Sequence, residues 1–522
     1  MKKFLIVFSS VLLISLSSCE EWLDINYDPN NATAASADLV LPGVLKGWAD
    51  NATGYATTFG AWMGYWAHAG GWSGWVSEKS YTVGASYAGG TMNSFYTGPL
   101  TDLKYIMEQD DLKGLQVNKA IAKVAWAWYY SRLVDMFGDV PYTEALNPTN
   151  TSPKYDDGQD IYNDLIVKLD EAMAVFQAAI ATPLAPEYAF KKSADIMYGG
   201  NFAQWTRFAN TLKLRLLMRQ TEVPGAGIAA KIATTVSYGF ITADASVNPG
   251  FDKVAGKMHP LWTTFGRSIT DVEASARTQY VMNNFFSNLM NTLNDPRLTR
   301  YFQPGVSAAG GALRSIKFGE SDGSASIHLN SSQAANINWA VLQDVTNTPP
   351  TDLGYNRRAI IIPLSEALLL QAEAIQRGYM TGNAKTMFEA GVRASCLWAQ
   401  VPVANITPYL TSGVNRADWD ASANKIEAII YQKYIANYFL GHMEAWMDYR
   451  RTGFPNPLAA DPTNSMLTYY FTYVRRQVPR LFPYPQLEFD INTDNVQAVI
   501  TKYGVPVDNF YTFDARTFWD KN

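Results

Sequence analysis

The stretch SEALLLQAEAIQRGYMTGNAKTMFEAGVRASCL, residues 365–397, carries the pattern that decides the fold. Two runs rich in alanine and leucine, residues 365–377 and 384–397, flank a turn that begins and ends with glycine, residues 378–382. Alanine and leucine favour helix and glycine ends it, so the stretch predicts a helical hairpin. An Ala-x-x-x-Phe spacing in the second run resembles tetratricopeptide hairpins, but no fixed period of about 34 residues recurs, so any repeat is irregular.

Helical spacing also occurs on both sides of this hairpin. Apolar residues return every three or four positions in four further stretches, which is typical of a helix with one buried face. They are Ile121, Val124, Ala125, Trp128 and Tyr129; Ile161, Leu165, Leu169, Ala172 and Phe176; Trp205, Phe208, Ala209, Leu212 and Leu216; and Ile426, Ile430, Tyr434 and Tyr438. We therefore predict a mainly α-helical fold with little β structure.

Long segments rich in glycine, serine, asparagine and proline interrupt the helical pattern. They cover residues 55–98, 247–270 and 304–347 and are too long to be simple connections. Loops of this length usually carry function. Although length alone would allow about three domains, we expect one helical domain, residues 38–522, whose loop-rich insertions cluster over one face.

The first residues have the pattern of a lipoprotein leader. Two lysines are followed by an apolar run, residues 4–14, that is too short to remain as a membrane-spanning helix. The sequence Leu-Ser-Ser-Cys at 16–19 then places small residues before Cys19, as a lipobox does. We predict a signal peptide at residues 1–18 and lipid attachment at Cys19; an ordinary secretory peptide that happens to end beside a cysteine is the alternative.

The residues after Cys19 predict a tether on an outer membrane. Glu20 and Glu21 come first, and the polar stretch up to residue 37 reads as an extended linker. In Gram-negative lipoproteins with similar starts, early acidic residues often mark export to the cell surface. We therefore expect a lipid-anchored protein on the outer face of the outer membrane.

Composition narrows the classes of protein and partner. The chain has 522 residues, 48% of them hydrophobic and 17% charged, so the mature part can bury a large core. Apart from Cys19 it has one cysteine, Cys396, so no disulfide framework is available. The formal net charge is −5 and no basic run occurs, which argues against a nucleic-acid partner.

Several motifs, in this order, resemble the SusD/RagB family of nutrient-binding outer-membrane lipoproteins, and most closely its SusD-like second subfamily. They are LDIN (23–26), DMFGDVPY (135–142), WTRFANTLKLR (205–215), NDPRL (294–298), residues 366–378, QKYIA (432–436), EAWMDYRRTGFP (444–455) and PRLFPYP (479–485). The charged side chains of the seventh motif, Glu444, Asp448, Arg450 and Arg451, suit ion pairs near a helix end and a structural role.

The resemblance implies more than the residues alone do. It implies a SusD-like fold, in which four tetratricopeptide-like hairpins form a scaffold and a variable, loop-rich part binds ligand. It implies a SusC-type TonB-dependent transporter as partner, over whose barrel the lipoprotein acts as a lid. Its ligand would be an oligosaccharide or an oligopeptide.

The segment 55–87 is the best candidate for a ligand-binding surface, because aromatic residues alternate there with glycines. Rigid aromatic rings give a large contact area at a small entropy cost, and their faces suit sugar rings or peptide side chains. The neutral aromatic character mildly favours sugars. The candidates are Trp72 and Trp75 first, then Trp66, Trp62, Tyr65 and Tyr81, with Trp262 from a second loop segment.

The alternative for part of this segment is a buried stripe. Trp62, Tyr65 and Trp66 fall at helical spacing, so they can equally anchor the insertion in the core. Trp72 and Trp75 stand in the sequence Gly-Gly-Trp-Ser-Gly-Trp, which is a poor context for helix. They are therefore the stronger candidates.

The sequence indicates neither a catalytic site nor a metal or cofactor. The four histidines are scattered, and no zinc-type spacing, nucleophile elbow, phosphate-binding loop or dinucleotide fingerprint occurs. A helical glycoside hydrolase remains an alternative, since an aromatic groove and two carboxylates are all that such chemistry requires. A purely structural surface protein is the third class, and it would lack an aromatic-lined concavity.

Overall fold

The computed structural model describes residues 35–69, 76–81, 83–109, 115–182, 190–319, 334–338, 342, 354–457, 466–467, 477–504 and 511–521. Within these residues the fold is mainly α-helical with short strands, which confirms the predicted class. The signal peptide, Cys19 and most of the tether lie outside them, and the predicted domain boundaries stay a prediction. No helix in the described part of the chain combines the length and apolarity needed to cross a bilayer.

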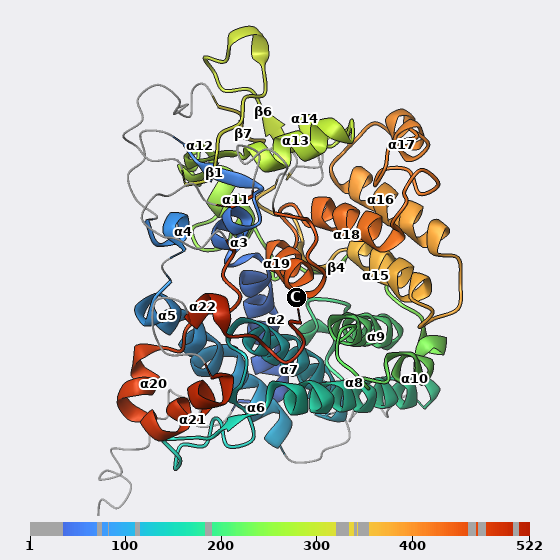
Figure 1. Ribbon diagram of the computed structural model, residues 1–522. Helices are drawn as coiled ribbons and strands as arrows, with labels where there is room; N and C mark the ends of the chain where they lie inside the picture. The colour runs from blue at the N-terminus through green and yellow to red at the C-terminus, as the bar shows by residue number, and fades with distance from the viewer. Residues whose placement is uncertain are drawn as a thin grey trace, which may run out of the picture.

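Three long helices form the lower part of the scaffold in Figure 1. Helices α7 (Leu115–Phe137), α8 (Gly158–Ala181) and α9 (Phe202–Arg219) pack in sequence order, α8 against both others. Polar caps begin two of them: the Asp157 carboxylate accepts the backbone N–H of Gln159 at the start of α8, and Asn201 accepts that of Gln204 in α9. The apolar positions predicted for these helices are all buried.

The hairpin at residues 365–397 is confirmed. Helices α15 (Leu364–Gln376) and α16 (Ala384–Trp398) pack closely, and both contact α18 (Lys425–Ala436). Gly391 allows the close approach, because a Cβ atom there would lie 2.7 Å from the Leu369 Cγ atom. The detailed likeness to tetratricopeptide repeats stays a prediction.

The remaining helices surround these two groups (Figure 1). They are α2 (Ala37–Thr53), α3 (Ala56–Trp62), α4 (Val76–Ser80), α5 (Ala85–Phe95), the π-helix η1 (Tyr96–Leu100), α6 (Thr101–Glu108), η3 (Lys192–Ala194), α10 (Ile228–Ala233), η4 (Val236–Tyr238), α11 (Pro260–Phe265), α12 (Ala276–Gln279), α13 (Asn284–Thr292), α14 (Leu298–Tyr301), η5 (Ala309–Gly311), α17 (Val403–Leu410), α19 (His442–Thr452), α20 (Gln486–Ile491), α21 (Thr493–Tyr503) and α22 (Tyr511–Asp514).

The strands form small antiparallel sheets. One has the order β1-β5-β7-β6, with β1 (Trp66–His68), β5 (Tyr280–Met282), β7 (Asn336–Ile337) and β6 (Phe302–Gln303). The others pair β2 (Val140–Pro141) with β3 (Tyr155–Asp156), and β4 (Ala245–Val247) with β8 (Ala359–Ile362). In the first sheet Trp66 lies opposite Met282, so the first loop-rich segment is joined there to distant parts of the chain.

Helix α19 holds the charged motif predicted to form ion pairs, and the pairing is confirmed. Most of the partners, however, lie on other elements rather than on α19 itself, because the motif is buried at a junction. The pairs are Glu444 with Arg219 (2.5 Å), Asp448 with Lys433 (2.9 Å) and with Arg451 (3.0 Å), Arg451 with Glu373 (2.6 Å), and Arg450 with Asp520 (3.3 Å). Breaking a buried pair of this kind costs about 3–5 kcal/mol, so the motif fixes how the helices meet.

Candidate functional site

Most of the aromatic residues predicted to bind ligand are core residues. Trp62, Tyr65, Trp66, Tyr81 and Trp262 are between 0% and 4% exposed. A ring that is enclosed on all sides offers no face to a sugar or a peptide, which argues against the predicted contact role for these side chains. The buried-stripe alternative describes the burial of Trp62 and Tyr65, although α3 ends at Trp62 and Tyr65 therefore lies beyond the helix.

Their contacts explain the burial. The Tyr65 ring stacks on Tyr434 with centroids 4.4 Å apart, and its hydroxyl donates to the Tyr434 carbonyl at 2.6 Å. The Trp66 Nε1–H donates to the Thr57 carbonyl at 3.1 Å. Trp62 packs edge-on against Phe482 with centroids 5.7 Å apart. These rings therefore anchor the insertion to the scaffold.

Tyr81 and Trp262 are held in the same way. The Tyr81 ring lies edge-on to Trp62 with centroids 6.1 Å apart. The backbone of Gly354 lies on the Trp262 ring so closely that a Cβ atom at Gly354 would come within 2.2 Å of it. Trp262 is thus covered by a segment that follows it by some ninety residues in sequence, which local sequence analysis could not anticipate.

Trp72 and Trp75 lie outside the described residues, so their predicted role stays a prediction. The described residues on either side of them are tied together. His68 in β1 lies with its Nε2 3.5 Å from Glu78 Oε2 in α4, and the Thr58 hydroxyl donates to Glu78 at 2.7 Å. All three side chains are buried, so both ends of the segment that carries Trp72 and Trp75 are anchored.

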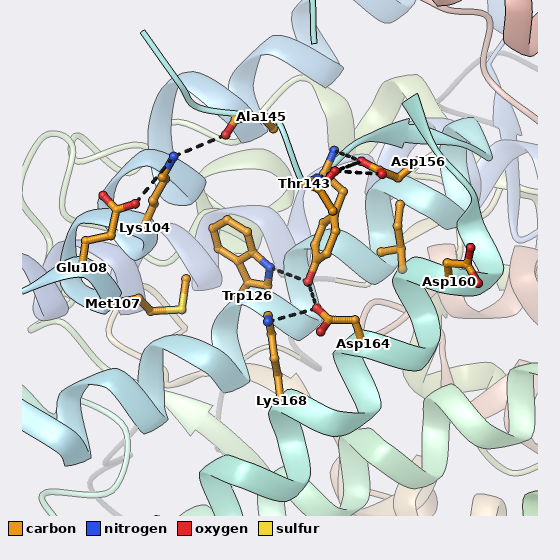
Figure 2. A pocket seen from close by; sticks show the side chains of 12 residues that line it. Lys104, Met107, Glu108, Trp126, Thr143, Ala145, Asp156, Asp160, Asp164 and Lys168 are labelled. Atoms are coloured by element: carbon orange, nitrogen blue, oxygen red, sulfur yellow. Dashed lines mark hydrogen bonds and ion pairs between the residues drawn. The ribbon is translucent and has the colours of Figure 1, made fainter. Parts of the chain in front are cut away.

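A groove on the helical scaffold forms a concave site among the described residues. It lies between α6, α7, α8 and the loop that follows β2, and it encloses about 540 Å³ (Figure 2). We call it the scaffold groove. It is lined by Lys104, Met107, Glu108, Trp126, Tyr142, Thr143, Ala145, Asp156, Asp160, Ile161, Asp164 and Lys168.

A chain of polar contacts joins residues that line the scaffold groove. The Trp126 Nε1–H donates to the Tyr142 hydroxyl at 3.1 Å, and that hydroxyl donates in turn to Asp164. Lys168 completes the chain, with Nζ 3.0 Å from Asp164 (Figure 2). Burial raises the pKa of Tyr142, and its hydrogen bond to Asp164 raises that pKa further, so the hydroxyl stays protonated as a donor.

The loop on one side of the groove is fixed by backbone hydrogen bonds. Asp156 Oδ2 accepts the N–H groups of Tyr142 at 3.1 Å and Thr143 at 2.8 Å. Further along the same loop, Lys104 Nζ donates to the Leu146 carbonyl at 2.9 Å. The wall of the groove is therefore set by contacts at both ends of the loop.

A second hollow of about 560 Å³ adjoins the scaffold groove and shares Lys104 and Glu108 with it. Its remaining lining residues are Thr101, Tyr105, Leu146, Asn147, Pro148 and Asn150. Neither hollow gathers metal ligands: across the described ranges, no group of three or more His, Cys, Asp or Glu side chains is placed to hold an ion.

Sequence analysis did not single out the scaffold groove, although one signal was present. Asp160, Asp164 and Lys168 follow each other at four-residue spacing, which predicts a polar stripe on one face of α8. A polar stripe beside the buried Trp126 could have indicated a site. The cavity itself could not be foreseen, because its volume depends on how the side chains of three helices pack.

The chain resembles known proteins along nearly its whole length. A SusD-like family described as "starch-binding associating with outer membrane" matches residues 29–485. No protein with curated annotation gives a significant match.

Solved structures with the same fold include SusD homologues from several bacteria. A SusD homologue from Bacteroides uniformis is 24% identical and superposes with a TM-score of 0.70 over 92% of this chain and 99% of its own. A homologue from Bacteroides fragilis is 21% identical, with a TM-score of 0.70 over 94% of this chain and 100% of its own. A chitin-binding SusD homologue from Flavobacterium johnsoniae is 22% identical, with a TM-score of 0.71 and coverage of 92% and 99%. At these identities the likeness establishes the shared fold.

Proposed function

The chain belongs to the SusD-like family of starch-binding proteins that associate with the outer membrane, and from this premise we propose that it captures oligosaccharides at the cell surface without cleaving them. The observation that carries the proposal is the family match over residues 29–485, joined to a fold shared with SusD homologues. The captured saccharide then passes to a SusC-type TonB-dependent transporter, over which the protein acts as a lid.

The N-terminal sequence supports the location. The short apolar run at residues 4–14 and the Leu-Ser-Ser-Cys sequence at 16–19 are those of a lipoprotein leader. Acyl chains on Cys19 would hold the domain on the membrane, and residues 20–37 would give it reach. The early acidic pair favours the outer face.

Among saccharides we propose chitin-type oligosaccharides first. One similar structure is that of a chitin-binding SusD homologue, and another is described as a chitin-binding protein with 22% identity and a TM-score of 0.73. An N-acetyl group adds an amide and a methyl group to each sugar ring, and both suit an aromatic surface with hydrogen-bonding neighbours. Oligopeptides remain the alternative ligand class.

Trp72 and Trp75 are the proposed contacts. The described residues on both sides of them are tied together through the buried pair of His68 and Glu78. Stacking on two indole rings, together with side-chain hydrogen bonds, would provide the affinity. Lid closure then requires that the closed, ligand-bound state be lower in free energy than the open state.

The test is calorimetric titration of the leader-free protein, residues 20–522, with chitotetraose, maltotetraose, xylotetraose and tetra-alanine, followed by chromatography of each mixture. We expect saturable binding of a saccharide that is recovered intact. Cleavage of the saccharide would establish a hydrolase instead. Binding of tetra-alanine alone would move the ligand class to peptides, and no binding to any of the four would contradict the proposal.

A further inference from the structure

We propose that the scaffold groove is a second saccharide-binding site, separate from the aromatic segment around Trp72 and Trp75, and that it takes a neutral sugar. The inference rests on the proposed function for its ligand class but on different residues for its site. It is carried by the size of the groove, the chemistry of its floor and rim, and the pairing of its charges.

The size of the scaffold groove suits a small ligand. Its volume of about 540 Å³ falls within the range of about 300–1,000 Å³ that is typical of small-molecule sites. The adjoining hollow of about 560 Å³ shares Lys104 and Glu108 with it, which lets a longer saccharide extend from one into the other.

The floor of the groove is apolar. Met107 from α6, Trp126 from α7 and Ala145 from the loop contribute to it (Figure 2), and Ile161 from α8 also lines the groove. Trp126 is only 7% exposed, so only a small part of its indole ring faces the groove. Such a floor suits the C–H groups of a sugar ring and adds no demand for hydrogen bonds.

The rim combines hydrogen-bond donors with acceptors. Lys104 and Lys168 donate, whereas Glu108, Asp160 and Asp164 accept. A sugar hydroxyl donates one hydrogen bond and accepts others, so it needs both kinds of partner within reach. A ligand with hydroxyl groups around an apolar ring matches this alternation better than a purely apolar ligand does.

Both lysines of the groove are paired with carboxylates. Lys104 Nζ lies 3.7 Å from Glu108, and Lys168 Nζ lies 3.0 Å from Asp164. No lysine is therefore left in excess, as an anionic sugar or a phosphate would require. Asp156 and Asp160 also line the groove, so its carboxylates outnumber its lysines and favour a neutral sugar over an anionic one.

The groove is also arranged before ligand arrives. Tyr142 is held from both sides, by the Trp126 Nε1–H and by Asp164, and its loop is fixed through Asp156. Side chains that are already ordered lose little entropy when a ligand binds. Asp160 and Lys168 both belong to α8 and line the groove, and they are the groups we expect to contact sugar hydroxyls.

The experiment is methyl NMR of leader-free protein labelled with ¹³C at its methionine methyl groups, titrated with chitotetraose, maltotetraose, xylotetraose and tetra-alanine. The Met107 methyl, assigned with Met107→Leu, reports on the groove. We expect a saturable shift of this resonance with a saccharide, and an affinity at least tenfold weaker in the Asp160→Ala, Lys168→Ala variant. The Asp50→Ala, Lys46→Ala variant, which removes an Asp and a Lys that form an exposed pair on α2, should behave as wild type.

The outcomes separate this inference from the proposed function. Trp72→Ala with Trp75→Ala should leave the Met107 response in place. If a saccharide shifts other methyl resonances or releases heat while Met107 does not respond, the groove is not a site and the proposed function stands. A Met107 shift that survives Asp160→Ala, Lys168→Ala unchanged, or that occurs only with tetra-alanine, also overturns the inference. A lack of any response to the saccharides overturns both.

Discussion

At the scale of single residues, the main result is that aromatic character alone does not identify a binding surface. Tyr65 and Trp66 stand in the segment most typical of a ligand platform, yet both are fully buried against helices from the C-terminal half. Trp72 and Trp75 differ from them in sequence by their glycine-rich context. That context, rather than the count of rings, is the reason to keep Trp72 and Trp75 as candidates.

The first prediction concerns Trp72 and Trp75. Replacing both by alanine should weaken saccharide binding by about 2 kcal/mol or more, roughly 30-fold, because buried tryptophans at an interface carry much of the binding energy. Calorimetric titration measures the affinity and thermal unfolding measures the stability. A large fall in melting temperature with unchanged affinity would instead make them core residues.

The second prediction concerns the pH dependence of stability through His442. Burial lowers the pKa of His442 to about 3, and the ring accepts the Phe439 backbone N–H at 3.2 Å. In the unfolded chain its pKa is about 6.5, so between these values the unfolded state binds more protons than the folded state. The contribution of His442 is therefore complete above about pH 6.5 and is lost as the pH falls toward 3.

The measurement for His442 is the free energy of unfolding between pH 4.5 and pH 6.5, a range above the ordinary carboxyl pKa values of about 4. In His442→Gln, whose amide oxygen can accept the same N–H, the slope with pH should be smaller by up to about 1.4 kcal/mol per pH unit. Identical slopes for both proteins would contradict the assignment.

At the scale of elements, the helices could be predicted from the sequence, whereas the short strands that pair beside them could not. The hairpin of α15 and α16 and the stripes of α7, α8 and α9 followed from residue spacing, because a helix repeats its buried face every three to four residues. The four-stranded sheet was not foreseen. Its strands are at most three residues long and pair with partners distant in sequence, up to 216 residues away for Trp66 and Met282, so periodicity could not reveal them.

The third prediction compares two helical glycines. A Cβ atom at Gly60 in α3 would lie 2.1 Å from the Trp66 ring, whereas one at Gly43 in α2 would meet nothing within 4 Å. Gly60→Ala should therefore destabilise the fold by about 1–3 kcal/mol through overpacking. Gly43→Ala should stabilise it by about 0.5–1 kcal/mol, because alanine loses less entropy than glycine in a helix.

Chemical denaturation of both variants provides the measurement. The two variants are expected to change the free energy of unfolding in opposite directions. Each is the control for the other, because both replace a helical glycine by alanine. If Gly60→Ala were as stable as wild type, the anchoring of the insertion by Trp66 would not hold.

At the scale of the whole molecule, the chain consists of a helical scaffold and loop-rich insertions. Acidic and basic side chains buried in the scaffold pair with one another. Burial alone would raise the pKa of Glu444, but Arg215 and Arg219 outweigh it and hold that pKa below its usual range. The scaffold was recognisable from the sequence because its motifs are continuous. The scaffold groove was not recognisable from the sequence. Its lining side chains come from three helices and a loop, and no continuous motif contains them all.

The fourth prediction concerns the membrane anchor. If lipid is attached to Cys19, Cys19→Ala should release the protein from the outer-membrane fraction, because the acyl chains that hold it on the membrane are then missing. Fractionation followed by immunoblotting measures this, and protease treatment of intact cells reports whether the wild-type protein faces outward. Retention of Cys19→Ala in the membrane fraction would contradict the anchor.

The most direct test of the account is uptake of a labelled saccharide by intact cells of the source bacterium, using the saccharide that binds in titration. Cells that lack the protein should take it up more slowly at low concentration, and wild-type protein should restore uptake whereas Trp72→Ala with Trp75→Ala should not. Uptake that is unchanged when the protein is absent would contradict its role in capture and delivery.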